Sequence, residues 1–165
     1  MQTATSFYRA GALSAALILL LAFAPLGGQA GERRSVALVG NAEGGTVSVL
    51  DAGTFENLGS FNAVPDLDWR LFLSAFRPVR AICREIIQTQ KGDKYVDDLR
   101  LLPDGRTLIV SRGTLGDVAA FDLTTGEMLW REDVGGCLSD HMAVSPDGDR
   151  AVGSDIRLGR GLVLD

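Results

Sequence analysis

The sequence predicts an all-β fold built from repeated antiparallel units, and an internal repeat carries that prediction. The turn tripeptide Pro103-Asp104-Gly105 recurs as Pro146-Asp147-Gly148, at an interval of 43 residues. Further pairs match at this interval without gaps: Asp97 and Asp140, Leu99 and Met142, Ser111 and Ser154, Gly116 and Gly159, and Asp122 and Asp165. A period of about 40–45 residues with strand-like content is typical of one blade of a β-propeller.

An earlier and more diverged copy aligns with the second at an interval of 71 residues. The matching pairs are Val39 and Val110, Gly45 and Gly116, Val47 and Val118, Asp51 and Asp122, Thr54 and Thr125, and Leu58 and Leu129. The longer interval places an insertion of 28 residues between Asn62 and Lys94. We therefore expect blades at about residues 35–61, 97–132 and 140–165. Because a propeller closes with about 4–8 blades, the chain predicts a partial β-propeller, an open arc of about three four-stranded blades.

Within each copy, short apolar runs alternate with turn residues. The run 108–110 (Leu-Ile-Val) is continuous, as in a strand covered on both faces. Residues 122–126 are typical of a hairpin loop. The predicted strands lie near 35–40, 46–51, 57–61, 97–102, 107–111, 117–122, 127–132, 140–145, 150–154 and 161–165. A β-sandwich has similar turn spacing, but the in-register recurrence favours the propeller.

The insertion changes from a strand period to a helical one over about residues 66–90. Its apolar residues form one helical stripe: Phe72, Phe76, Val79, Cys83 and Ile86. Pro78 predicts a break, so we expect a short helix to about Ser74 and a second one from Pro78. Asp66 or Asp68 could cap the first turn. The helical pair either covers part of the propeller face or serves as a lid or a docking surface.

Residues 1–30 have the pattern of a signal peptide. Arg9 is the only charged side chain before Glu32, an apolar run extends from Ala10 to Ala24, and residues 28–30 are Gly-Gln-Ala. The apolar run is shorter than the roughly 20 residues of a membrane-spanning helix, which favours cleavage after Ala30 over an uncleaved anchor. The sequence therefore predicts a secreted or periplasmic protein with its propeller region at 31–165.

The charge distribution argues against two classes of partner. The chain has 16 basic and 21 acidic residues and a net charge of −5. Because no lysine or arginine cluster was recognised, we expect neither nucleic-acid binding nor membrane contact beyond the signal segment. The predicted partner is a protein or a small polar ligand.

Cys83 and Cys137 are the only two cysteines. An even count in an exported protein permits a disulfide. Repeat phase places both on connections that project from the same face of adjacent blades. The alternative is two unpaired, small hydrophobic side chains.

The segments 36–41 and 45–51 (VALVGN, GTVSVLD), with 143–148 and 162–165 (AVSPDG, LVLD), resemble YVTN-type, YncE-like bacterial propeller repeats. The similarity covers most of the chain after residue 34 except the insertion. It implies a fold of the quinoprotein-dehydrogenase-like propeller superfamily, in seven-bladed proteins that are typically exported. Lactonases and quinoprotein-like dehydrogenases have similar folds. Complete members have several more blades, so the chain looks like a fragment of a longer protein.

The sequence contains no strong catalytic motif. Its candidate ligand site is predicted from residues that occupy equivalent positions in the two aligned repeats. Asp97 and Asp98 align with Asp140 and His141, just before the innermost strand of each blade. Such positions surround the mouth of a propeller channel. Three carboxylates and an imidazole could bind a divalent cation or a hydroxylated ligand, although no cofactor is predicted. The alternative is that all four are turn residues that bond to local amides or to solvent.

Three further side chains have open roles. Arg112 could contact an anionic ligand, although solvation is the favoured interpretation, and Trp69 and Trp130 are interpreted as packing residues.

Two functions remain open from the sequence. The first is a non-catalytic binding or scaffold module of an exported propeller protein. The second is an enzyme of the lactonase or quinoprotein-like dehydrogenase kind, with its site at the channel mouth. In either case an open arc leaves sheet faces and strand edges without neighbours, so we expect self-association.

Overall fold

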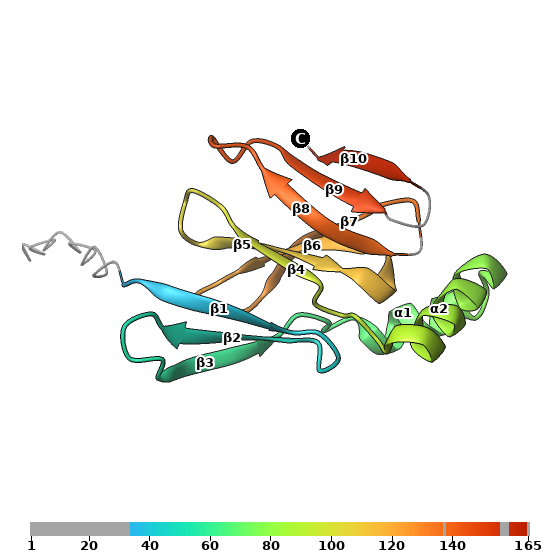
Figure 1. Ribbon diagram of the computed structural model, residues 1–165, viewed down its shortest axis with the longest axis horizontal. Helices are drawn as coiled ribbons and strands as arrows, with labels where there is room; N and C mark the ends of the chain where they lie inside the picture. Colours follow the sequence, from blue (N-terminus) through green and yellow to red (C-terminus); the bar gives the residue numbers. More distant parts are fainter. Residues whose placement is uncertain (1–33, 137, 156–158, 165) are drawn as a thin grey trace, which may run out of the picture. The chain divides into compact units, whose positions relative to one another are not determined.

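The computed structural model describes residues 34–136, 138–155 and 159–164, which contain three antiparallel sheets and a helical pair (Figure 1). The predicted signal segment, residues 1–30, lies outside the described residues. The fold class predicted from the sequence is confirmed: the chain is an all-β partial propeller with a short α-helical insertion.

Each sheet follows the order of its strands along the chain. The first sheet contains β1 (Val36–Asn41), β2 (Thr46–Asp51) and β3 (Asn57–Asn62). The middle sheet contains β4 (Asp98–Leu101), β5 (Thr107–Arg112), β6 (Asp117–Asp122) and β7 (Met128–Asp133). The third contains β8 (Ser139–Val144), β9 (Ala151–Asp155) and β10 (Arg160–Leu164). All ten predicted strands are present, and within the described residues only the middle sheet has four.

The recurring glycine of the repeat has a backbone explanation. Gly45, Gly116 and Gly159, which the two intervals align, have φ values of 64°, 64° and 60°. A side chain in this left-handed region is strained, so glycine is favoured at this position of every copy. The aligned Asp51 and Asp122 are also equivalent: each accepts hydrogen bonds from backbone amides two and three residues further on. The repeat is therefore a repeat of turn geometry.

The two central strands of the middle sheet, β5 and β6, are buried on both faces. Leu108, Val110 and Phe121 belong to a core cluster that includes Val47 of the first sheet. On the opposite face, Ile109 and Val118 pack with side chains of the third sheet, including Met142 and Ala151. Successive residues of a strand point to opposite faces. This explains why β5 is a continuous apolar run.

The insertion forms α1 (Leu67–Ser74) and α2 (Pro78–Lys91), and Pro78 is the first residue of α2, as expected. The predicted cap is wrong, because Asp66 occupies the N-cap position of α1 without a side-chain capping bond. Its carboxylate binds Arg112 instead, at 2.6 Å. A buried guanidinium is a stronger partner for a carboxylate than an exposed amide.

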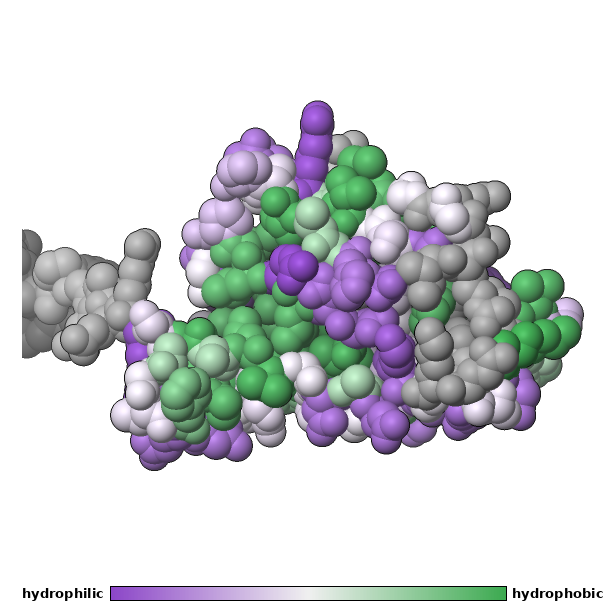
Figure 2. Space-filling model, in the orientation of Figure 1, coloured by the Kyte–Doolittle hydropathy of each residue, from purple (hydrophilic) through white to green (hydrophobic). Residues whose placement is uncertain are grey.

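The apolar stripe of the insertion does not simply cover the propeller. Phe72, Phe76 and Val79 are 55%, 71% and 69% exposed. Figure 2 shows a hydrophobic surface at the end of the molecule where the helices lie. Within the described residues, neither helix has the length and hydrophobicity required to cross a membrane.

Candidate functional site

The four residues predicted from repeat phase lie near the start of β4 and on β8. Asp98 ties these two strands together: its Oδ2 accepts a hydrogen bond from the backbone amide of Met142 at 2.8 Å. Its Oδ1 accepts from Arg100 at 2.7 Å, and the Arg100 Nε donates to the Met142 carbonyl at 3.0 Å. Both oxygens of Asp98 are thus engaged in joining neighbouring sheets.

The other three predicted residues differ in exposure and partners. Asp97 Oδ1 lies 3.1 Å from Lys94 Nζ, whereas its buried Oδ2 has no hydrogen-bond partner. His141 has a side chain that is 81% exposed, with Nε2 3.8 Å from Asp140 Oδ1. Among the described residues, no three His, Cys, Asp or Glu side chains are grouped so that they could hold a metal ion. The predicted ligand site at these residues stays a prediction.

The predicted disulfide lies outside what the structure describes. Cys137 and the side chain of Cys83 are not among the described parts of the chain. The bridge therefore remains a prediction from the cysteine count and the repeat phase.

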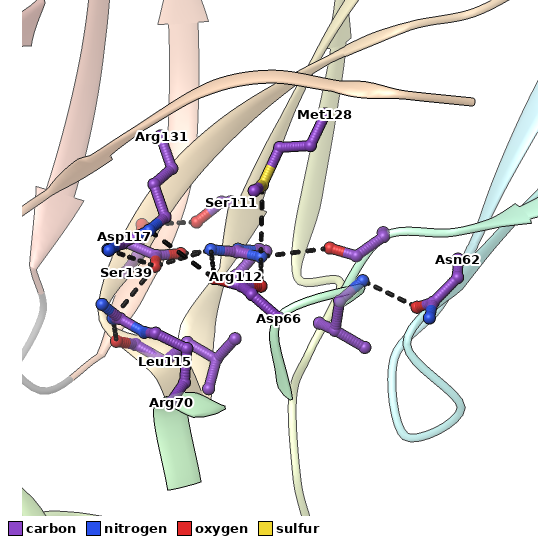
Figure 3. A network of polar contacts seen from close by, with 12 residues as sticks. Asn62, Asp66, Arg70, Ser111, Arg112, Leu115, Asp117, Met128, Arg131 and Ser139 are labelled. Carbon is purple, nitrogen blue, oxygen red and sulfur yellow. Dashed lines mark hydrogen bonds and ion pairs between the residues drawn. The ribbon is translucent and has the colours of Figure 1, made fainter. Parts of the chain in front are cut away.

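Among the described residues, Arg112, the last residue of β5, has the largest fully buried side chain, and a network of polar contacts surrounds it (Figure 3). Its side chain is fully buried, so the interpretation of Arg112 as a solvated residue is wrong. Arg112 Nε and Nη2 donate to the two oxygens of Asp117 at 2.6 and 2.7 Å. Its Nη1 donates to Asp66 at 2.6 Å. The fixed fork of the guanidinium suits this two-point contact.

Two more arginines extend the network toward the surface. Arg70 of α1 lies 3.0 Å from Asp117 Oδ2 and donates to the Leu115 carbonyl at 2.9 Å. Arg131 of β7 lies 3.6 Å from Asp66 and 3.8 Å from Asp117. The network therefore joins the insertion to three strands of the middle sheet, as Figure 3 shows.

Arg112 and Asp66 hold each other in their charged forms. Burial alone would lower the pKa of Arg112, but hydrogen bonds and charges from Asp117 and Asp66 outweigh it and raise that pKa. Burial would likewise raise the pKa of Asp66, yet the hydrogen bond and charge of Arg112 keep it below its ordinary value. The contact between Arg112 and Asp66 is therefore an ion pair at neutral pH.

A cavity of about 200 Å³ opens beside this network, between the insertion and the middle sheet. Its walls come from both helices, from the 3₁₀ turn η1 (Gly113–Leu115), and from β7. The lining residues are Arg70, Leu71, Leu73, Ser74, Arg77, Arg84, Thr114, Leu115, Arg131, Asp133 and Gly136. Four of them are arginines and one is an aspartate.

The arginine cavity, as we name this space, was missed by the sequence reasoning, which found no basic cluster. Arg70, Arg77 and Arg84 are spaced by seven residues, which is close to two helical turns. The break at Pro78 divides them between α1, the link and α2, so this spacing did not by itself predict one basic face. The fourth arginine, Arg131, comes from a strand, and its place could not be inferred from helical periodicity.

Comparison with known proteins supports the fold alone. No family model matches the chain, and no curated protein matches it. Hydrazine synthase of Kuenenia stuttgartiensis is a structural neighbour with a TM-score of 0.51 and 18% identity, over 73% of this chain and 26% of that one. Dihydro-heme d1 dehydrogenase NirN has a TM-score of 0.51 and 19% identity, over 79% of this chain and 22% of its own.

A third structural neighbour is a 6-phosphogluconolactonase-like protein of Bacteroides fragilis. Its TM-score is 0.53 at 17% identity, over 78% of this chain and 31% of that protein. The chain thus spans less than a third of the length of each of these neighbours. The structural similarity supports a propeller-type fold. At this low sequence identity it carries no information about ligand or reaction.

Proposed function

We propose that this chain is part of an exported propeller protein of the YVTN type, and that it binds a small ligand without transforming it. The binding site in this proposal is the arginine cavity. The one observation that supports it is the cavity itself, where two helices inserted between repeats meet the middle sheet around a space of about 200 Å³. Recognition sites are commonly carried by insertions on a rigid scaffold.

The scaffold is suited to this role because the insertion is anchored. Arg70 of α1 pairs with Asp117, whose side chain is fully buried, and Asp66 pairs with the fully buried Arg112. Side chains held by buried partners keep their positions when a ligand arrives, which lowers the entropic cost of binding.

Ligand screening by NMR tests this proposal. The full chain, labelled with nitrogen-15, would be screened against a small-molecule library that contains neutral, cationic and anionic compounds. We expect at least one compound to shift the amide signals of Thr114, Leu115 and Asp133 and to remain chemically unchanged. If no compound of the library shifts these signals, or if the bound compound is converted, the proposal fails.

The enzyme alternative has one observation of its own. Two of the structural neighbours are a dehydrogenase and a lactonase-like protein, although their identities of 19% and 17% support only the fold. In this alternative, Asp97, Asp98, Asp140 and His141 form the site at the channel mouth. Turnover of a lactone or an alcohol by a longer form of the protein, lost in His141→Ala, would favour the enzyme over the binding module.

Export is part of the proposal and has a separate test. Expression of the full chain in a bacterial host, followed by mass spectrometry, would give the mature N-terminus. Cleavage after Ala30 with recovery from the periplasm supports export. An intact N-terminus in the cytoplasmic fraction contradicts it.

A further inference from the structure

We infer that the arginine cavity takes a small dianion, such as a dicarboxylate or a phosphate monoester. This inference rests on the proposed function, because it names the ligand class of the same site. It is carried by the charge balance of the cavity, by an unpartnered buried nitrogen of Arg84, and by the size of the space.

The wall of the cavity carries more positive than negative charge. Four guanidinium groups line it, those of Arg70, Arg77, Arg84 and Arg131, against one lining carboxylate, that of Asp133. Further carboxylates lie behind this wall, including Asp93, which shares the Tyr95 hydroxyl with Arg84. The lining is therefore positive in a chain whose net charge is −5, and an anion with two negative charges suits it.

Asp66 and Asp117 do not neutralise the lining arginines fully, because each of these carboxylates is also bonded to the buried Arg112. Asp117 accepts two bonds from Arg112 and one contact from Arg70 at 3.0 Å. Asp66 binds Arg112 at 2.6 Å and lies 3.6 Å from Arg131. Both carboxylates therefore stand behind the cavity and balance its inner arginines, while Arg77 and Arg84 bring further positive charge from the helical side.

Arg84 provides the second observation. Its Nε is buried and has no hydrogen-bond partner. Buried donors are nearly always paired in folded proteins, so an unpaired one calls for an acceptor. Arg84 lines the cavity, and its guanidinium shares the Tyr95 hydroxyl with Asp93, whose buried Oδ1 also lacks a hydrogen-bond partner. An oxyanion in the cavity is the acceptor that this inference assigns to Arg84.

The size and lining restrict the ligand further. A volume of about 200 Å³ lies below the roughly 300–1,000 Å³ of sites for drug-sized ligands, so the anion is small. Leu71, Leu73 and Leu115 supply apolar wall between the arginines. A short carbon skeleton that carries oxyanion charge matches both features, and the guanidinium fork pairs with both carboxylate and phosphate groups.

Isothermal titration calorimetry of the full chain tests the inference with defined probes. Succinate and methyl phosphate are the dianionic probes, and acetate and neutral succinamide are the matched controls. We expect at least one dianion to bind at least tenfold more tightly than acetate, and succinamide to give no heat. The affinity should fall as salt increases, because the attraction is between charges.

Variants locate the site. Arg84→Gln should weaken the binding of that dianion at least tenfold, and Arg84→Lys should restore only part of it, because lysine keeps the charge and loses the Nε donor. Arg77→Gln is a second cavity variant in case Arg84→Gln fails to fold. Arg34→Gln is the control, since Arg34 is exposed, pairs with Asp51 and lies outside the cavity.

The outcomes separate this inference from the function on which it rests. If a neutral compound occupies the cavity in the NMR screen and no dianion binds, the binding function stands and the inference fails. If nothing occupies the cavity, both fail. Unchanged dianion affinity in both Arg84→Gln and Arg77→Gln, or equal affinity for succinate and succinamide, would also overturn the inference.

Discussion

At the scale of single residues, Arg112 and Asp117 form a fully buried ion pair. Both side chains are fully buried, and each would be costly to bury without the other. The sequence did not predict that either residue is buried. An arginine at the end of a strand is buried only if another part of the chain covers it. Here that cover comes from the insertion, through Asp66 and Arg70.

Removing one member of this pair should destabilise the protein strongly. We expect Arg112→Leu to lower the free energy of unfolding by about 3–5 kcal/mol, because Asp117 would stay buried with fewer partners. Arg106→Leu is the matched control: it removes an arginine–aspartate pair whose arginine is 63% exposed, so its effect should be much smaller. Urea denaturation followed by circular dichroism measures both, and equal losses in the two variants would contradict the argument.

The same network predicts how stability depends on acid. The folded pKa of Asp66 is lowered, so its contribution is fully present above the unfolded pKa of about 3.9 and is lost as the pH falls through the folded value. Asp51 behaves similarly, with a pKa of about 2 set by amide hydrogen bonds and by Arg34. We expect the urea midpoint to fall between pH 5 and pH 2. Asp66→Asn should be less stable at pH 7 and should lose less on acidification; an identical pH profile would refute the assignment.

At the scale of elements, the sequence predicted each strand and the break between the helices. Turn residues such as Gly105 and Gly116 act locally, and Pro78 fixes a helix start whatever surrounds it. What covers the helices could not be predicted, because periodicity defines an apolar face but not its partner. The stripe of Phe72, Phe76 and Val79 remains exposed. The insertion is held by polar contacts of Asp66 and Arg70 together with apolar packing of Leu67.

Those polar contacts predict a local unfolding unit. Arg70→Gln removes the pair with Asp117 at 3.0 Å and the bond to the Leu115 carbonyl at 2.9 Å. We expect amide hydrogen exchange to become faster across α1 and α2, while β5 and β6 stay protected. Arg77→Gln is the control, because Arg77 is exposed on the link between the helices. Unchanged exchange in α1 would show that apolar packing, and not this arginine, anchors the insertion.

At the scale of the whole molecule, the repeat predicted a propeller-type architecture but not the arginine cavity. The cavity combines a helix pair that the repeat does not contain with Arg131 of β7, a residue more than 45 positions from the end of α1. The candidate site at Asp97, Asp98, Asp140 and His141 followed from repeat phase alone. An equivalent position in the repeat predicts where a side chain lies but not which hydrogen bonds it makes. Asp98 illustrates this, because both of its carboxylate oxygens accept hydrogen bonds from the protein.

Two of the surfaces that the described residues leave open are suited to association. β10 is an edge strand of the third sheet, and beside it a groove lined by Trp130, Leu162 and Val163 separates that sheet from β7. The second surface is an aromatic ladder on α1 and the link that follows it, where Trp69 and Phe76 each lie next to Phe72, with ring centroids 5.5 and 5.2 Å from that of Phe72. An open strand edge supplies unpaired backbone groups as well as apolar area, whereas the ladder supplies apolar area only.

We therefore expect the edge to dominate self-association of the full chain. Val163 is 58% exposed on β10, and a lysine there places a charge where a second strand would pair. Val163→Lys should lower the weight-average mass in light scattering toward that of the monomer, with little change in the thermal midpoint. Phe76→Ser, at a residue that is 71% exposed, is the matched removal of apolar surface from the ladder and should leave the mass nearly unchanged. If Phe76→Ser dissociates the protein and Val163→Lys does not, the aromatic ladder is the associating surface; a wild-type chain that is monomeric at all concentrations tested contradicts both.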